Sequence, residues 1–581
     1  MPTYMRVWVP YYADAIAGDW QPALLPHESF FLSFRTVHSA SIDPSPSKTQ
    51  LNLRMNSTTG GFARPYMDGK LLPFSGTLTS SVVVSATLVA FVIHRLIIIV
   101  YRLYFHPLSS FPGPRLAAIT SLYEWYYAIL YPKPVPWVEY QRSVLHPKYG
   151  PIVRVRPDAL HITDPEAYRQ IHKVGSKFQK ARFFYGLFNL ESTLFGSVDL
   201  ESHRKRRALV APLFTKPEIT GLYERTVKEK VSLLVSRVAD VVRKKGGQGR
   251  VPMEHALSAF TFDISAEVIF NGGFDVLKSR DMRHQVTDSV DLVVEAAILN
   301  RYFPSFIPLI NSIPAWFMKL VYPVALGQKT LRDAVKDEVD KLVQQKRTGT
   351  FDDTKERAII AQLLSHLDPQ TVEEEGYTML GAAIHTTQWS IQRHLYHLAV
   401  YPGVQEKVLA ELKSAYPDKD SDMSYAKLES LPYFAAFMKE ANRLAHAIPG
   451  SVPRETPMDE STEFCGRHIP PGTILESDMY NMHLHEGIFP NPEKLEPERW
   501  LQGDKSKTLE KFLLHFNMGN YMCVGYTLAN LTMYIAVAAF VRKFEIKLTP
   551  ELEKEGFLFE APWTAVKRGA AVEYICRERT E

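Results

Sequence analysis

One cysteine in this chain has surroundings suited to a metal ligand. Cys523 lies in the stretch Phe516-Asn-Met-Gly519-Asn-Tyr-Met-Cys523-Val-Gly525, and an apolar helical segment follows directly. Glycines let the backbone turn tightly and approach a flat macrocycle, and amides at the start of a helix can hydrogen-bond the sulfur. The pattern predicts an axial thiolate for haem iron, a ligand that favours O–O cleavage. The alternative is a buried structural cysteine.

Composition narrows the chemistry further. The 581 residues are 46% hydrophobic and 22% charged, which is typical of a globular chain. A net charge of +4 is too small to indicate nucleic-acid binding. Three cysteines make no disulfide framework and fit a reducing compartment. Neither a dinucleotide fingerprint nor a phosphate loop is present, so a redox reaction would draw electrons from a separate protein.

The N-terminal part of the chain divides into three predicted segments. Residues 1–78 lack the pattern of a signal peptide and form an extension of unknown role. Residues 79–105 contain an apolar helix that spans about 30 Å and predicts a single transmembrane anchor, the alternative being an interfacial helix. Arg95 near its centre costs about 3 kcal/mol unless its side chain snorkels. Residues 106–116 form a proline-rich hinge.

The stretch around Cys523 resembles the cysteine-ligand loop of the cytochrome P-450 family, Phe-x-x-Gly-x-Arg-x-Cys-x-Gly. Phe516, Gly519, Cys523 and Gly525 match this pattern. The resemblance continues in the family's order over most of residues 100–581, and it is greatest to fungal members of secondary metabolism, including trichodiene oxygenase-like proteins.

The resemblance implies an architecture and a location. We expect a mainly α fold with a small β-rich lobe (α+β), in which residues 117–581 form the haem-thiolate catalytic domain. The hinge Phe-Pro-Gly-Pro-Arg at 111–115 is similar to the segment after the anchor in membrane-bound members. This implies an endoplasmic reticulum membrane protein with a cytosolic catalytic domain, which leaves Asn56 as a lumenal glycosylation candidate.

A basic segment, His203-Arg-Lys-Arg-Arg207, opens an apolar helix. Such a patch is usually a solvated face. The two propionates of a haem nevertheless need cationic partners, and the family places a Trp/His-x-x-x-Arg pair here. His203 and Arg207 match that pair, whereas Arg204 and Arg206 are predicted to face solvent. Arg454 matches a family position that reaches or lies near a propionate.

Tyr521 is the departure with most consequence, because the family has arginine there. Tyrosine donates one hydrogen bond but carries no charge. Haem affinity is expected to fall, with Arg207 and Arg454 left to retain the cofactor.

The segment 379–388 is predicted to lie in a long helix and contains two adjacent threonines, which are mildly unfavourable in a helix interior. The family reads Ala/Gly-Gly-x-Asp/Glu-Thr-Thr here, and its first threonine holds water and relays protons to dioxygen. Thr386 matches that threonine, while Ala383 replaces the glycine and His385 replaces the acid. His385 could relay protons itself, or could be a histidine with no part in turnover.

Glu440 and Arg443 lie three residues apart on a predicted helix, which alone indicates a trivial surface pair. The family pairs this motif with a downstream arginine, matched by Arg499, in a Glu-Arg-Arg network that folds the loop before the cysteine. We predict a structural role for this network.

Periodicity predicts the other elements. Residues 150–165 show short β-type runs, after which Asp164-Pro165 caps a helix. Residues 219–245 and 328–347 have the spacing of amphipathic helices. Residues 295–327 are apolar and interrupted by prolines, and they form either the roof of a substrate pocket or ordinary core.

Three hypotheses follow. The first is a membrane-anchored monooxygenase with haem b that inserts one oxygen atom from O2 into a lipophilic secondary metabolite, a terpenoid first. Electrons would come from NADPH through a partner NADPH-cytochrome reductase. The second is a haem-thiolate enzyme that catalyses a rearrangement, dehydration or cyclisation, motivated by the altered Ala383 and His385. The third, motivated by Tyr521, is a catalytically degenerate relative.

Overall fold

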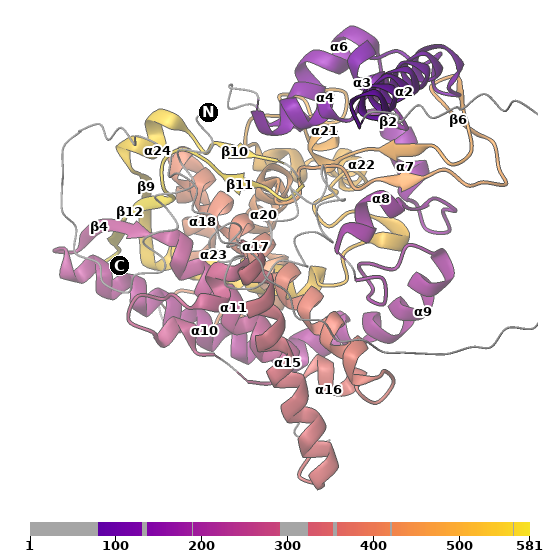
Figure 1. Ribbon diagram of the computed structural model, residues 1–581. Helices are drawn as coiled ribbons and strands as arrows, with labels where there is room; N and C mark the ends of the chain where they lie inside the picture. The colour runs from indigo at the N-terminus through magenta and orange to yellow at the C-terminus, as the bar shows by residue number, and fades with distance from the viewer. Residues whose placement is uncertain are drawn as a thin grey trace, which may run out of the picture. The chain divides into compact units, whose positions relative to one another are not determined.

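The computed structural model (Figure 1) describes residues 80–130, 136–188, 190–272, 274–290, 324–351, 357–418, 421–561 and 563–580. The chain divides into two compact units, and the boundary lies between His94 and Arg95. Asn56 and nearly all of the proline-interrupted stretch 295–327 lie outside the described residues. The prediction of a mainly helical chain with small sheets is confirmed.

Helix α2 (Ser80–Val100) contains the predicted apolar run. A short π-helical turn, Tyr101–Phe105, continues it. The stretch Val82–Phe105 has a mean hydropathy of 2.4 and is long enough to cross a membrane. The side chains between Val82 and Val100 are almost all exposed.

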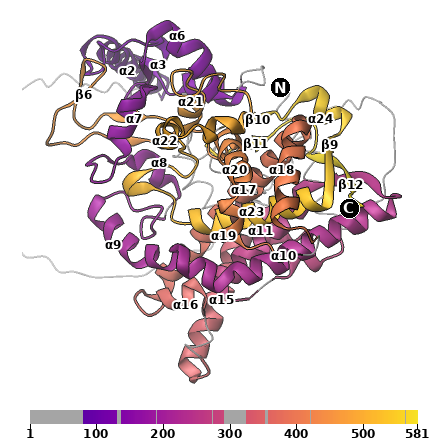
Figure 2. The same cartoon turned by 180° about the vertical axis from the view of Figure 1, so that it is seen from behind.

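Helix α17 (Pro369–Val400) runs through the middle of the helical part (Figures 1 and 2). It packs against α11 (Met253–Phe270), α15 (Val324–Thr348), α20 (Pro432–Ala445) and α23 (Tyr526–Lys543). Asp368 caps its start by accepting a hydrogen bond from the N–H of Thr371 at 3.0 Å. A helix surrounded in this way can hold side chains at a fixed depth in the protein.

The predicted amphipathic helices are present. The predicted helix 219–245 corresponds to α10 (Lys216–Lys244), which ends one residue earlier, and 328–347 fall within α15. The buried positions of α10 recur at steps of three and four, so that one stripe faces the core; they include Ile219, Tyr223, Val227, Val231, Leu234 and Val238.

A five-stranded sheet has the order β1-β2-β8-β5-β3. The predicted β-type runs within 150–165 are present as β1 (Ile152–Arg156) and β2 (Ala159–Ile162), which pair antiparallel. β2 runs parallel to β8 (Ile474–Glu476), which is antiparallel to β5 (Arg454–Glu455), and β5 pairs antiparallel with β3 (Gln179–Lys180). As predicted, Asp164 caps the next helix, α7 (Pro165–His172), by accepting from the N–H of Ala167 at 2.7 Å.

The remaining elements connect these parts. The helices are α3 (Arg115–Ile119), α4 (Leu122–Trp125), α5 (Trp137–Tyr140), α6 (His146–Tyr149), α8 (Arg182–Tyr185), α9 (Leu200–Val210), α16 (Ile359–Leu363), α18 (Pro402–Ala415), α19 (Tyr425–Ser430), α21 (Met479–His483), α22 (Asp504–Glu510) and α24 (Pro550–Glu555). The strands are β4 (Gln248–Pro252), β6 (Thr462–Phe464), β7 (Arg467–Ile469), β9 (Phe544–Leu548), β10 (Phe559–Glu560), β11 (Val566–Lys567) and β12 (Glu573–Glu578).

Buried histidines surround the contact between α17 and α20. His394 and His397 lie on α17, His446 ends α20, and His483 ends α21. Burial lowers the pKa of His394 to about 3 and holds those of the other three well below the usual value of about 6.5. These side chains are therefore neutral in the folded protein.

We predict that the free energy of unfolding falls as pH drops below 6.5. The unfolded chain then binds protons that the folded protein cannot, at about 1.4 kcal/mol per pH unit for each such histidine. Denaturant titrations at pH 7.5, 6.5 and 5.5 measure the slope. His394→Gln should reduce it by one histidine's share, whereas replacing the exposed His468 by Gln should not. A slope unchanged by His394→Gln contradicts this account.

Candidate haem site

The loop before Cys523 needs glycine at one position. Gly519 has φ +67°, and a Cβ atom there would lie 1.8 Å from the carbonyl oxygen of His172. Any side chain would therefore force the loop away from α7. Gly525 differs, because its φ of −81° suits any residue and a Cβ would lie 4.0 Å from the Cys523 sulfur. Gly525 therefore leaves room beside the sulfur, but its backbone conformation does not require glycine.

Two asparagines attach this loop to α7 and the turn after it. Tyr168 donates its hydroxyl to Asn517 Oδ1 at 3.1 Å. Asn520 Oδ1 accepts from the N–H of Gly175, and its Nδ2 donates to the carbonyl of Ser176, both at 3.0 Å. These hydrogen bonds fix the position of the cysteine loop relative to α7.

The Cys523 thiol is accessible at the surface of its loop but is surrounded by protein atoms. Its side chain is exposed, yet burial raises its pKa, while a hydrogen bond from the backbone of Gly525 and the nearby Arg207 oppose that shift. Since Gly525 is the residue before α23, the thiol lies at the N-terminal end of that helix.

The predicted threonine lies on a face of α17 that borders open space. The Thr386 hydroxyl donates to the carbonyl of Ala382 at 2.8 Å, which leaves its oxygen lone pairs as acceptors. Ala382 is exposed although most of its helix is buried, and a Cβ placed on Gly381 would meet nothing within 4 Å. Ala383 is half-buried.

Ser390 and His515 connect the threonine segment to the cysteine loop. Ser390 lies one turn after Thr386 and donates to its carbonyl at 2.8 Å. The same hydroxyl lies 3.4 Å from Nε2 of His515, the residue before Phe516. The two predicted motifs are therefore neighbours in space although they are far apart in sequence.

His385 is neutral in this environment. Burial lowers its pKa to about 4, and its ring stacks on Trp389 with centroids 6.1 Å apart. Its Nδ1 has no hydrogen-bond partner in the described part of the chain. Such a group can pass a proton only through a water or a ligand that reaches it.

The predicted propionate partners gather around Tyr521. The buried His203 of α9 lies 4.6 Å from the Tyr521 ring, and the Arg454 guanidinium lies 4.4 Å from the centroid of that ring. Burial lowers the pKa of His203 to about 3. Arg207 donates from Nη1 to the carbonyl of Met522 at 2.9 Å, one residue before the thiol.

One expectation about this patch was wrong. Arg204 is exposed as predicted, but the Arg206 side chain is only 15% exposed and lies 3.5 Å from the buried Glu375 of α17. The helix turns this residue toward a carboxylate from another element, and periodicity on α9 alone could not indicate that partner.

Sequence reasoning missed Lys180. This lysine is 4% exposed on strand β3 and donates to the carbonyls of Leu194 and Phe195 at 2.9 and 2.7 Å. Its ammonium also lies 5.3 Å from the Tyr521 ring centroid. Only the pairing of β3 with β5 brings it to the site, and two-residue strands leave no periodic signal.

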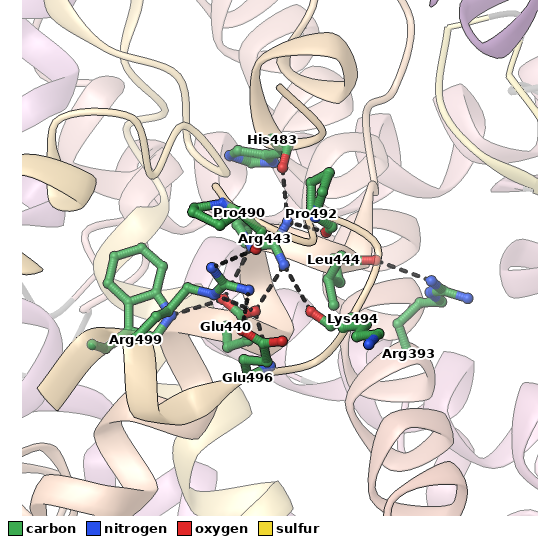
Figure 3. Close-up of polar contacts among 11 residues, drawn as sticks. Arg393, Glu440, Arg443, Leu444, His483, Pro490, Pro492, Lys494, Glu496 and Arg499 are labelled. Carbon is green, nitrogen blue, oxygen red and sulfur yellow. Dashed lines mark hydrogen bonds and ion pairs between the residues drawn. The ribbon is translucent and has the colours of Figure 1, made fainter. Parts of the chain in front are cut away.

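Glu440 is the centre of a buried network (Figure 3). Its carboxylate accepts from Arg443 at 2.7 and 3.0 Å and from Arg499 at 3.0 Å. Trp500 Nε1 and the N–H of Glu496 add two more hydrogen bonds, at 2.8 and 3.1 Å. The structure thus brings together the three residues that the sequence predicted as a network.

The two arginines of this network donate hydrogen bonds to backbone carbonyls at the end of α21 and in the segment that follows it. Arg443 donates to the carbonyls of His483, Pro492 and Lys494, and Arg499 donates to that of Pro490. Figure 3 shows the two arginines with the carbonyl groups of His483, Pro490, Pro492 and Lys494 that accept these bonds. The charges of Glu440, Arg443 and Arg499 are thus paired within the protein.

Aromatic side chains from separate segments form one cluster. The Trp563 ring lies 5.4 to 5.6 Å from three phenylalanine rings of the segment after β3, those of Phe184, Phe188 and Phe195. Gly450 packs against Trp563, and its N–H donates to the Trp563 carbonyl at 2.9 Å. The cluster lies beside Lys180, whose ammonium is 5.9 Å from the Phe195 ring centroid.

These features fit a haem. An accessible thiol lies at a helix N-terminus, and the cations Arg207, Arg454 and Lys180 lie beside its loop. That donor set suits a flat iron macrocycle with two carboxylates.

Comparison with known proteins identifies a family that binds haem. The family model for cytochrome P-450 matches residues 135–566. The chain is 30% identical to cytochrome P-450 monooxygenase sdnE of Sordaria araneosa, over 81% of this chain and 93% of that protein. It is 29% identical to cytochrome P-450 monooxygenase TRI4 of Trichoderma arundinaceum (77% and 86%), and 30% identical to tryptophan 6-hydroxylase fscE of Fusarium equiseti (83% and 92%).

The chain therefore belongs to the cytochrome P-450 family. It is an oxidoreductase of the monooxygenase type, similar to fungal enzymes of secondary metabolism, as the sequence resemblance predicted.

We predict that Glu440→Gln lowers the free energy of unfolding by about 3–5 kcal/mol, because two buried arginines lose their shared anion. Denaturant unfolding of the purified protein measures the change. Asp504→Asn is the matched control, since it removes an exposed carboxylate that pairs with Lys507 at 2.9 Å. If the two variants unfold alike, the network does not support the fold.

Proposed function

We propose that this chain is a membrane-anchored haem-thiolate monooxygenase that inserts one oxygen atom from O2 into a lipophilic secondary metabolite, with terpenoids as the leading class. The observation that carries the proposal is the Cys523 thiol, which is accessible at the start of α23 beside the N–H of Gly525. Thiolate-ligated haem supplies reductive activation of O2 when it is bound.

The residues around Cys523 have separate roles in this proposal. Cys523 is the iron ligand, and Phe516, Gly519 and Gly525 shape its loop. Arg207 and Arg454 bind propionates, and His203 and Tyr521 complete that wall of the site. The hydrogen bond from Gly525 and the charge of Arg207 both favour the thiolate over the thiol, which offsets the effect of burial.

Thr386 is the proposed proton-relay residue. Its hydroxyl donates a hydrogen bond to the Ala382 carbonyl, so its oxygen can accept a hydrogen bond from a water in the adjacent space. His385 is a second relay candidate. As a neutral imidazole it can take a proton at one nitrogen and release one at the other.

The aromatic cluster supports an apolar substrate. Its rings offer one polar group, the Trp563 N–H, whose nitrogen has no partner among the described residues. A terpenoid with one oxygen could accept a hydrogen bond from that N–H. Similarity to TRI4 is a further reason to test terpenoids first.

The apolar helix α2 supports the membrane anchor, and the absence of a nucleotide motif supports electron supply from NADPH by a partner reductase. An endoplasmic reticulum location with a cytosolic catalytic domain follows from the similarity of the hinge to that of anchored members.

The direct test is turnover in membranes that contain a P-450 reductase, with NADPH, ¹⁸O2 and panels of terpenoids and indoles. We expect one ¹⁸O atom in a terpenoid product and none with Cys523→Ser. A product that forms without reductase would indicate the rearrangement or dehydration hypothesis instead. ¹⁸O found only in indole products would replace the terpenoid class.

We predict that Thr386→Ala lowers the fraction of NADPH electrons recovered in product by about tenfold or more, because positioned proton transfer is lost. Thr386→Ser should retain coupling. Thr220→Ala is the control, since Thr220 makes the same bond to the carbonyl four residues earlier, at 2.8 Å, on the exposed face of α10. Unchanged coupling in Thr386→Ala would remove this residue from the relay.

A further inference from the structure

Two buried cations face each other across β3 and β5. Lys180 and Arg454 are direct partners in the antiparallel register, and their exposed fractions are 4% and 1%. Like charges in such a cross-strand pair repel, and each has also lost its hydration. Burial and the neighbouring charge of Arg454 lower the pKa of Lys180 well below its usual value, so an anion close to both groups is needed to hold this lysine in its charged form.

The described part of the chain supplies no carboxylate within ion-pair distance of either cation. The nearby Glu375 is occupied by Arg206 and by the N–H of Leu194. Both cations also keep unused donors. Lys180 has three N–H groups, of which two donate to backbone carbonyls. Arg454 Nε is buried without a partner. Charge and donors are therefore available to a bound carboxylate.

Tyr521 lies against both cations. Its ring centroid is 4.4 Å from the Arg454 guanidinium and 5.3 Å from the Lys180 ammonium, within the range of cation–π attraction. Its hydroxyl donates to the carbonyl of Phe178 at 3.4 Å, so that its polar end is directed to the chain just before β3. The ring thus supports the cations without adding a charge.

We propose that Lys180 supplies the positive charge that Tyr521 lacks, and that it binds a haem propionate together with Arg454. This inference rests on the haem-thiolate function proposed above. Its ligand chemistry is a charge-assisted hydrogen bond from the ammonium to a carboxylate, in a desolvated site where such bonds are strong.

The test measures the rate at which the purified holoprotein loses haem to apomyoglobin. Lys180→Met should lose haem about tenfold faster than the unmodified protein. Lys177→Met is the matched control, because it makes the same charge change three residues earlier at an exposed lysine that pairs with Glu460 at 2.7 Å. Equal rates for the two variants overturn the inference.

A second set of variants separates charge from packing, since Lys180 also holds the carbonyls of Leu194 and Phe195. Tyr521→Arg in the Lys180→Met background should restore slow haem loss, whereas Tyr521→Arg alone should gain little over the unmodified protein. Failure of the double variant to recover would show that Lys180 acts through loop packing, and would contradict the inference.

The source of the carboxylate is tested with haem dimethyl ester, in which both propionates are masked. After reconstitution of the apoprotein, the unmodified protein and Lys180→Met should lose this analogue at equal rates. A persistent difference would mean that the lysine does not bind a propionate. If the unmodified protein itself holds no haem, the proposed function fails instead, which is a separate outcome.

Discussion

The buried carboxylate of Glu440 is the interaction on which the presentation of the site depends. It joins α20 to the segment after α21 through two arginines, and those arginines bind one backbone carbonyl at the end of α21 and three in the segment that follows. A loop of this length would otherwise cost considerable conformational entropy to order. The cysteine loop follows this segment in the chain, so the same network helps to fix the position of Cys523.

The second constraint is the close approach of the cysteine loop to α7. Only glycine fits at position 519, and the hydrogen bonds of Asn517 and Asn520 hold the loop on both sides of it. Ser390 and His515 link the cysteine loop to the Thr386 segment. Rigid support of this kind is what pre-organised chemistry requires.

How much of this could be predicted depended on how local each signal was. The cysteine loop, the Glu440–Arg443 pair and the amphipathic helices carry their pattern within a few residues, so their positions followed from sequence and from the family resemblance. Arg206 was misplaced because its partner, Glu375, comes from a different helix. Lys180 was missed because its role depends on the register of two short strands. The sequence showed that Tyr521 lacks a charge, but the lysine beside it emerged only from the packing.

The central claim is that Cys523 binds haem iron as a thiolate, and a reduced carbon-monoxide difference spectrum of the membrane-expressed protein tests it most directly. The account predicts the strongly red-shifted Soret band of thiolate-ligated haem, and the loss of that band in Cys523→Ser. A folded protein without the band, or an unchanged band in Cys523→Ser, would contradict the account.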